Sequence, residues 1–261
     1  MAEPDVYLAV ALSGRALAMA IRRAGRRARV IDLFGDTDTR ASAEASLVAE
    51  GDFERGFDGA ALLAAAERLA PTGAGASCGL VYGTGLESHP DLLAGLAKGR
   101  RLYGNKPETV AATKDPRQFF ASLERLGIPH PQVSFETPGD LSGWLSKGIG
   151  GSGGSHVRSA ATRSSDSAAT YYQRRVAGRP IGVSFLANGW DACVVGCNEQ
   201  WTSSDDGSNE FRFGGTLQPA ALALSIMAAM PEVLAALTGE FGLVGLNSLD
   251  ILVDGDEFKV I

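Results

Sequence analysis

The chain has 261 residues, of which 45% are hydrophobic and 21% are charged. This composition is typical of a folded globular protein with one large domain or two to three small ones. The net charge of −6 argues against the basic surface that nucleic acid or an anionic membrane requires, so we expect neither as a partner. An acidic residue precedes the short first apolar run, which is not typical of a secretory signal or a membrane span, and we expect a cytoplasmic protein.

The first third of the chain alternates between strand and helix patterns. Apolar runs of strand length alternate with helical spacing in the order strand 6–12, helix 14–25, strand 28–34, helix 59–70, strand 78–83 and helix 90–99. This order predicts a parallel sheet covered by helices. Gly14 follows the first strand, and Gly83 and Gly85 follow a later one. Neither site completes the three-glycine dinucleotide fingerprint, so nicotinamide binding is only a weak alternative.

The middle third begins with a strong helix pattern. Asp115 is a suitable N-cap, Pro116 fits the first helical position, and Gly127 ends the helix. The segment "WLSKGIGGSGGSHV" (144–157) then reads as a strand, a glycine-rich loop and a second strand. A flexible spacer between domains is the alternative, but the flanking strands favour a hairpin that closes over a ligand.

The rest of the chain predicts a sheet and one long helix. Residues 171–189 read as two strands around a Gly-Arg-Pro turn, and 191–200 continue the sheet. A long helix is expected over 218–242, kinked or split at Pro231. The last pattern is a hairpin, with strands at 249–253 and 257–261 on either side of Asp-Gly-Asp.

The three cysteines do not form a disulfide framework or a zinc site. They are Cys78, Cys193 and Cys197. Cys193 and Cys197 are four residues apart in a strand pattern, so we expect them to share one face of the sheet. All three are expected to be buried structural thiols.

Four features in this order resemble the ATP-grasp superfamily. A Rossmann-like region comes first, then Lys114 before a helix that ends in "GIPHP", then Lys147 on a strand that enters the glycine loop, and last Asp250 on a hairpin strand. The resemblance covers nearly the whole chain and is greatest to the predicted ATP-dependent carboligases related to biotin carboxylase.

The resemblance implies an α/β fold with two successive parts. A Rossmann-like pre-ATP-grasp domain (1–105) would precede an ATP-grasp α+β domain with a glycine-rich β-hairpin lid. The latter would comprise a small lid subdomain (106–178) and a C-terminal subdomain (179–261).

The same resemblance implies an ATP site. Lysines reach phosphates as point charges, glycines let backbone N–H groups approach phosphate oxygens, and serines add donors. Gln173 stands where many members have Glu before the residues whose backbone reads adenine, although an ordinary edge strand is the alternative there. The implied ATP-binding residues are Lys114, Lys147, Gly151, Ser152, Gly153, Gly154, Ser155, Gln173, Arg174 and Val176.

Asp250 resembles the first magnesium ligand of the family, because Mg²⁺ takes hard oxygen ligands. The usual Glu-x-Asn ligands would follow Ile261, so we expect either further chain or an incomplete metal site, and favour the former. Arg212 and, less strongly, Asn247 are candidates for contact with the transferred phosphoryl group, although Arg212 fits a surface strand equally well. The three histidines read as structural, but His156 adjoins the lid.

The implied activity is that of an ATP-dependent ligase that joins a small-molecule carboxylate to an amine. An acyl phosphate would be the intermediate, ADP and phosphate the by-products, and cofactor biosynthesis of one-carbon metabolism the setting. The alternatives are a non-catalytic nucleotide-binding module, a biotin-carboxylase-like enzyme, and an α/β domain without a nucleotide site. A homodimer is a candidate assembly.

Overall fold

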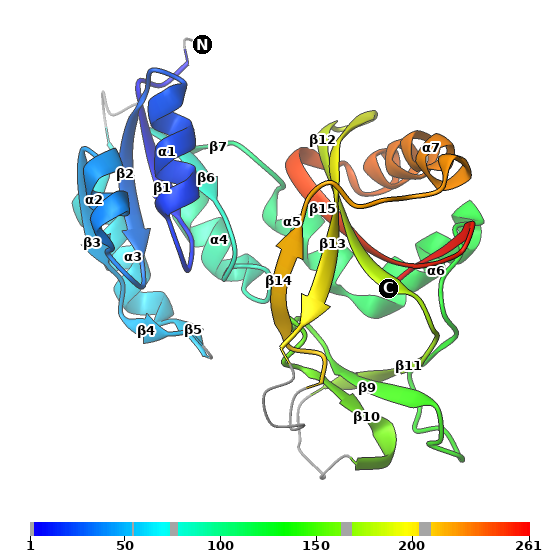
Figure 1. Ribbon diagram of the computed structural model, residues 1–261. Coiled ribbons are helices and arrows are strands. Elements are labelled where there is room, and N and C mark those ends of the chain that lie inside the picture. The colour runs from blue at the N-terminus through cyan, green and yellow to red at the C-terminus, as the bar shows by residue number, and fades with distance from the viewer. Residues whose placement is uncertain (1–2, 54, 74–77, 163–168, 204–209) are drawn as a thin grey trace. The chain divides into compact units, whose positions relative to one another are not determined.

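The computed structural model describes residues 3–53, 55–73, 78–162, 169–203 and 210–261. The chain divides into two compact units, Met1–Val110 and Ala111–Ile261 (Figure 1). The finer division of the second unit into lid and C-terminal subdomains stays a prediction.

The first unit is a five-stranded parallel sheet, as its strand and helix alternation predicts. Its strand order is β3-β2-β1-β6-β7. The strands are β1 (Val6–Val10), β2 (Arg27–Asp32), β3 (Ala45–Val48), β6 (Cys78–Tyr82) and β7 (Arg101–Leu102). The helices are α1 (Arg15–Arg23), α2 (Thr37–Ser42), α3 (Gly59–Leu69) and α4 (Pro90–Ala97). A small hairpin, β4 (Gly51–Asp52) with β5 (Gly56–Phe57), completes the unit. All five residues of β1 are buried, which is expected for a central parallel strand with helices on both faces.

Two helices lead into the second unit. They are α5 (Pro107–Lys114) and α6 (Pro116–Leu126). The predicted helix signals are confirmed, because the Asp115 side chain accepts a hydrogen bond from the Arg117 N–H and Gly127 adopts a left-handed conformation with φ 67°.

A four-stranded antiparallel sheet follows, with strand order β10-β9-β11-β8. Its strands are β8 (Val133–Ser134), β9 (Trp144–Gly148), β10 (Val157–Ser159) and β11 (Thr170–Arg174), with a short 3-10 helix η1 (Ala160–Thr162). The glycine-rich loop joins β9 to β10 as a hairpin within this unit, so the spacer alternative is wrong.

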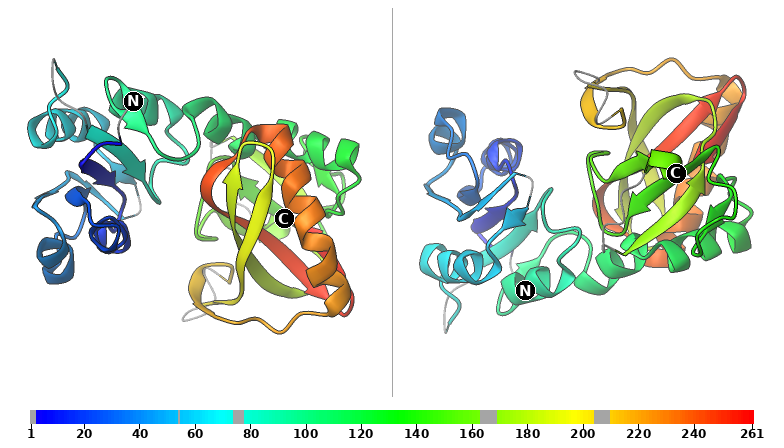
Figure 2. Two further views of the ribbon diagram at one scale, coloured as in Figure 1. Left: turned by 90° about the horizontal axis from the view of Figure 1, so that it is seen from above. Right: turned by 90° about the horizontal axis from the view of Figure 1, so that it is seen from below.

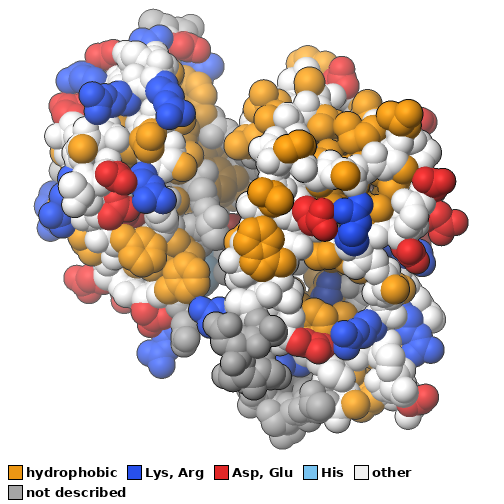
Figure 3. All heavy atoms as spheres, viewed as in Figure 1, with side chains coloured by type: hydrophobic (Ala, Val, Ile, Leu, Met, Phe, Trp, Pro, Cys, Tyr) orange, Lys and Arg blue, Asp and Glu red, His pale blue; other side chains and the backbone are white. Residues whose placement is uncertain are grey.

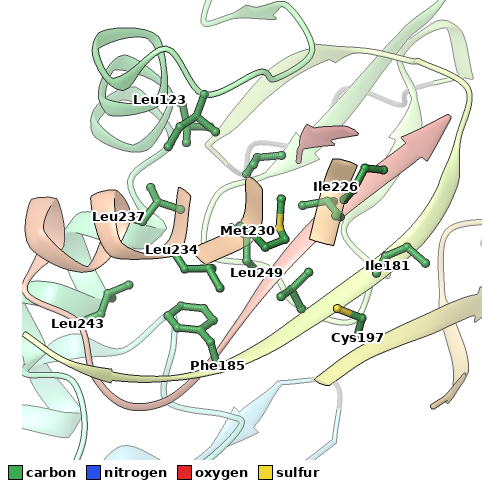
Figure 4. Close-up of a cluster of buried hydrophobic side chains, with 14 of the residues drawn as sticks. Leu123, Ile181, Phe185, Cys197, Ile226, Met230, Leu234, Leu237, Leu243 and Leu249 are labelled. Atoms are coloured by element: carbon green, nitrogen blue, oxygen red, sulfur yellow. The ribbon is translucent and has the colours of Figure 1, made fainter. Parts of the chain in front are cut away.

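The large sheet of the second unit has five antiparallel strands in the order β14-β13-β12-β15-β16. They are β12 (Arg179–Asn188), β13 (Ala192–Thr202), β14 (Phe213–Leu217), β15 (Val244–Asp254) and β16 (Glu257–Val260). One face packs on α7 (Leu224–Phe241), as the view from above in Figure 2 shows. Ile181, Phe185 and Leu249 from the sheet meet Met230 and Leu234 from α7 in this core (Figure 4). Because side chains alternate along a strand, the even-numbered residues of β12 and β15 lie on the other face.

The structure corrects the expectations about the cysteines and about the long helix. Cys193 and Cys197 lie on opposite faces of β13, Cys193 exposed and Cys197 buried, because a β-bulge beside Phe185 inserts one residue between them. Cys78 is half-buried, so the expectation of three buried thiols is also wrong. The long helix begins at Leu224 rather than at 218, and it continues through Pro231 without being split.

Among the described residues, α7 alone is long and apolar enough to cross a membrane by length and composition. Five of its buried side chains belong to the core of the large sheet, which is typical of a core helix in a globular domain. On the face of the molecule in Figure 3, acidic and basic side chains are interspersed.

Candidate nucleotide-binding site

Lys147 is a buried lysine without a hydrogen-bond or ion-pair partner among the described residues. It lies on β9, where only 9% of the residue is exposed. It is directly opposite Tyr171 on β11 and Val157 on β10, which fixes the direction of its side chain. Burial lowers the pKa of Lys147 to about 8, although the carboxylate of Asp250 acts in the opposite direction. A bound anion would therefore stabilise the charged form of this buried lysine.

Asp250 stands on the face of the large sheet that is turned away from α7. Its Oδ1 accepts a hydrogen bond of 3.0 Å from the Nε2 of Gln200 on β13. The intervening strand β12 has Gly182 opposite Asp250, and a Cβ atom there would approach the Gln200 amide to 2.6 Å. Glycine therefore allows the two side chains to meet across β12. Asn198 and Ser184 extend the same polar face, with 3.2 Å between the Asn198 Nδ2 and the Ser184 Oγ.

The glycine-rich loop (148–156) is anchored to the segment that enters β14. The Phe213 N–H donates a 2.9 Å hydrogen bond to the Gly153 carbonyl. Gly154 has a φ of +74°, and a Cβ atom there would overlap the Phe211 carbonyl oxygen. Only glycine fits at position 154, because the positive φ and the close approach of the Phe211 carbonyl both exclude a Cβ atom. Ser152 and Ser155 are exposed, and the Ser155 Oγ donates to the Ser152 carbonyl at 3.4 Å.

His156 closes the loop and lies among cationic side chains. Burial lowers its pKa to about 4, and Lys147 and Lys114 both act in the same direction. Lys114, the last residue of α5, thus acts on the same imidazole as Lys147 although the two lysines are far apart in the sequence. A Cβ atom on Gly151 would overlap the His156 ring, so glycine at 151 lets the ring lie against the loop.

Gln173 is the predicted residue before the adenine-reading segment. It is 2% exposed on β11, and its Nε2 has no hydrogen-bond partner among the described residues. Gln173 is opposite Leu145 and therefore faces the same side of the small sheet as Lys147. A buried amide nitrogen without a partner is costly, which favours a ligand atom beside it.

The residues after Gln173 have mostly satisfied backbone donors. The Arg174 N–H donates to Gln132 and the Arg175 N–H to Gly143. The Arg174 guanidinium turns to the other side, where it donates to the Ser142 carbonyl at 2.7 Å. The Val176 N–H, in contrast, has no hydrogen-bond partner among the described residues.

The two candidates for contact with the transferred phosphoryl group lie apart. Arg212 is exposed next to Phe213, beside the glycine-rich loop. Asn247 lies opposite Phe185 on the α7 side of the sheet, and its Nδ2 donates to the carbonyls of Val244 and Gly245. The structure therefore does not bring Asn247 to Asp250, because the two lie on opposite faces of β15.

The first unit does not offer its helix N-terminus to a phosphate. Asp32, fully buried at the end of β2, accepts a 2.9 Å hydrogen bond from the Gly14 N–H at the start of α1. It also accepts from the Gly35 N–H at 2.8 Å. The Gly14 N–H at this helix N-terminus is thus already satisfied by a carboxylate and is not available to a phosphate, which disfavours the nicotinamide alternative at this position.

The residues present fit a magnesium ion that arrives with a polyphosphate. The described residues contain no group of three or more His, Cys, Asp or Glu side chains that could hold a metal ion. Asp250 supplies one carboxylate, and Mg²⁺ is commonly bound through one or two carboxylates with phosphate and water oxygens. The two lysines and the unpaired Gln173 amide fit the anionic and base ends of a nucleotide.

Comparison with known proteins identifies the family. The model of the ATP-grasp domain matches residues 113–261. This is more than half of the chain, and the chain therefore belongs to the ATP-grasp family. A comparison with characterised proteins gave no significant sequence match.

Solved structures agree with this fold. The chain resembles biotin carboxylase from Campylobacter jejuni, with 18% identity, a TM-score of 0.73, and 97% of this chain and 64% of that chain covered. It also resembles N5-carboxyaminoimidazole ribonucleotide synthetase from Thermotoga maritima, with 16% identity, a TM-score of 0.67, and coverage of 99% and 68%. A third similar structure is the biotin carboxylase domain dimer of 2-oxoglutarate carboxylase from Hydrogenobacter thermophilus. Its identity to this chain is 12% and its TM-score 0.72, with 97% of this chain and 62% of that chain covered. The chain thus spans about two thirds of each of these proteins.

Two residues of the candidate site, Gln200 and Gly182, are not predicted from the sequence. Gln200 lies at the end of a strand with an ordinary alternating pattern, and Gly182 looks like a routine strand glycine. Gly182 was the one signal in the sequence that could have indicated this contact, since glycine inside a strand often marks a close approach of neighbouring groups.

Proposed function

We propose that this protein is an ATP-dependent ligase that activates a carboxylate as an acyl phosphate and transfers it to an amine. The observation that carries the proposal is the convergence of Lys147, buried and without a partner, with Lys114 and with the Asp250–Gln200 pair. The polyphosphate of ATP would supply the negative charge that pairs with Lys147. The chemistry implied by the family is then attack of a carboxylate oxygen on the γ-phosphorus with release of ADP, followed by attack of the amine nitrogen, loss of its proton and release of phosphate.

The residues of this chain have distinct roles in that proposal. Lys147 and Lys114 neutralise and orient the phosphates from two separate elements. Asp250 would hold Mg²⁺, and Gln200 orients the carboxylate through its hydrogen bond. The glycine-rich loop covers the phosphates and excludes water. Arg212 is the candidate that stabilises the transferred phosphoryl group, and Gln173 with Val176 would bind the base.

Binding of Mg-ATP is the first test of this proposal. We expect calorimetry to detect binding of Mg-ATP by the wild-type chain, and much weaker binding of ATP with EDTA. Lys147→Met should weaken binding at least tenfold, because a charge-assisted hydrogen bond contributes about 1.5–3 kcal/mol. Lys98→Met is the matched control, since Lys98 is an exposed residue of the first unit. Unchanged affinity in Lys147→Met would contradict the assignment of the site.

Hydroxylamine tests the acyl phosphate. It traps acyl phosphates as hydroxamates, so we expect hydroxamate and ADP to form together when the correct organic acid is supplied. The cofactor-biosynthesis setting and a dimeric assembly remain predictions.

A biotin-carboxylase-like reaction is a second candidate. The Hydrogenobacter thermophilus structure is described with MgADP and bicarbonate, which suggests bicarbonate as the acid. ADP formation that depends on bicarbonate and not on organic acids would favour this candidate over an amide-forming ligase.

A further inference from the structure

His156 has an environment that the proposed reaction does not use. Its Nδ1 is buried without a hydrogen-bond partner among the described residues. The ring lies against the glycine-rich loop, where a Cβ atom on Gly151 would overlap it. The side chain is therefore held at the base of the loop, where its buried Nδ1 makes no hydrogen bond of good geometry with the described residues, although the Ser152 backbone lies close enough to favour the protonated ring.

Among the described residues, the charged groups that act most strongly on His156 come from three elements and are cationic. Lys147 is on β9, Lys114 is at the end of α5, and Arg158 is on β10. Together with burial they disfavour a charged ring, while the Ser152 backbone acts in the opposite direction. In the free protein the imidazole is consequently neutral near pH 7.

A polyphosphate reverses this balance. ATP carries about four negative charges, which attract a proton to a neighbouring imidazole and raise its pKa. An imidazolium donates from both ring nitrogens, so the buried Nδ1 could then donate to a phosphate oxygen. Near pH 6.5 the imidazole, which is neutral in the free protein, can therefore gain a proton when the anion arrives.

We propose that His156 is a phosphate-contacting residue and that it takes up a proton when Mg-ATP binds. This inference rests on the proposed nucleotide site. It adds a proton-linked contact that strengthens binding as the pH falls from 8 toward 6.

Calorimetry of Mg-ATP binding in buffers with different ionisation enthalpies tests the inference, because it reports affinity and linked protons together. We expect the wild-type chain at pH 6.5 to take up about half a proton more than His156→Gln, if the bound ring has its ordinary pKa of about 6.5. Protons exchanged by ATP itself cancel in this difference. With these pKa values the proton-linked contact should make His156→Gln bind about fourfold more weakly than the wild type at pH 6, with almost no such difference at pH 8.

His130→Gln is the matched control. His130 lies in the same unit, and its Nδ1 is 2.9 Å from the Pro131 carbonyl, so this variant should match the wild type in proton uptake. Equal proton counts for the wild type and His156→Gln would overturn the inference while leaving the nucleotide site intact. Absence of Mg-ATP binding by the wild type would instead refute the proposed function, and the inference would fall with it.

Discussion

Replacing Lys147 with methionine should stabilise the free protein while it removes the nucleotide site. Methionine keeps the length of the side chain and removes the buried charge. The pKa of Lys147 falls from its ordinary value of 10.5 to about 8 on folding. At about 1.4 kcal/mol for each pKa unit, this fall corresponds to about 3 kcal/mol of unfavourable charging energy at neutral pH.

The dependence on pH has a definite sign. The unfolded chain keeps this proton up to about pH 10.5, and the folded chain keeps it only up to about pH 8. The penalty is therefore fully present below pH 8 and fades as the pH rises toward 10.5. We expect Lys147→Met to exceed the wild type in unfolding free energy by up to about 3 kcal/mol at pH 7 and by much less at pH 10.

Urea unfolding followed by tryptophan fluorescence is the suitable assay. All three tryptophans, Trp144, Trp190 and Trp201, belong to the second unit, so the signal reports the unit that contains Lys147. Lys98→Met controls for the chemical change at an exposed position. Addition of Mg-ATP at 100 times its dissociation constant should stabilise the wild type by about 2.7 kcal/mol and the variant far less. A variant that is less stable than the wild type at pH 7 would refute the reasoning about the buried charge.

Two further substitutions test the loop and the core. Gly154→Ala should weaken Mg-ATP binding in calorimetry, because its Cβ atom would overlap the Phe211 carbonyl oxygen and displace the loop from its anchor. Gly153→Ala is the control, since Gly153 has a similar positive φ but open space around it, and it should weaken binding less. Equal effects of the two substitutions would contradict this explanation. Leu234→Ala should lower the unfolding free energy by about 3–5 kcal/mol in urea, because Leu234 is fully buried in α7. Leu224→Ala in the same helix, at an 87% exposed position, should change it by less than about 0.5 kcal/mol, and similar losses in both variants would argue against the observed packing of α7.

The sequence by itself determined most of the elements and the order of the site motifs. Apolar runs of strand length, the Asp115 cap and the Gly127 ending are local signals, and local signals fix where elements begin and end. The same local signals predicted the hairpin around the glycine-rich loop and carried the resemblance to the family. Short elements such as α2 (Thr37–Ser42) and β3 (Ala45–Val48) were missed, because they have too few residues to establish a period.

Tertiary structure alone decided which of these residues meet. Asp250 and Gln200 are 50 residues apart and touch only because both strands pair with β12, where Gly182 leaves room between them. Simple alternation along β13 would place Cys193 and Cys197 on the same face, but the bulge between them places them on opposite faces. The pKa values of Lys147 and His156 depend on burial and on charges from other elements. Such distances and burial are properties of the folded chain, so no pattern of neighbouring residues could supply them.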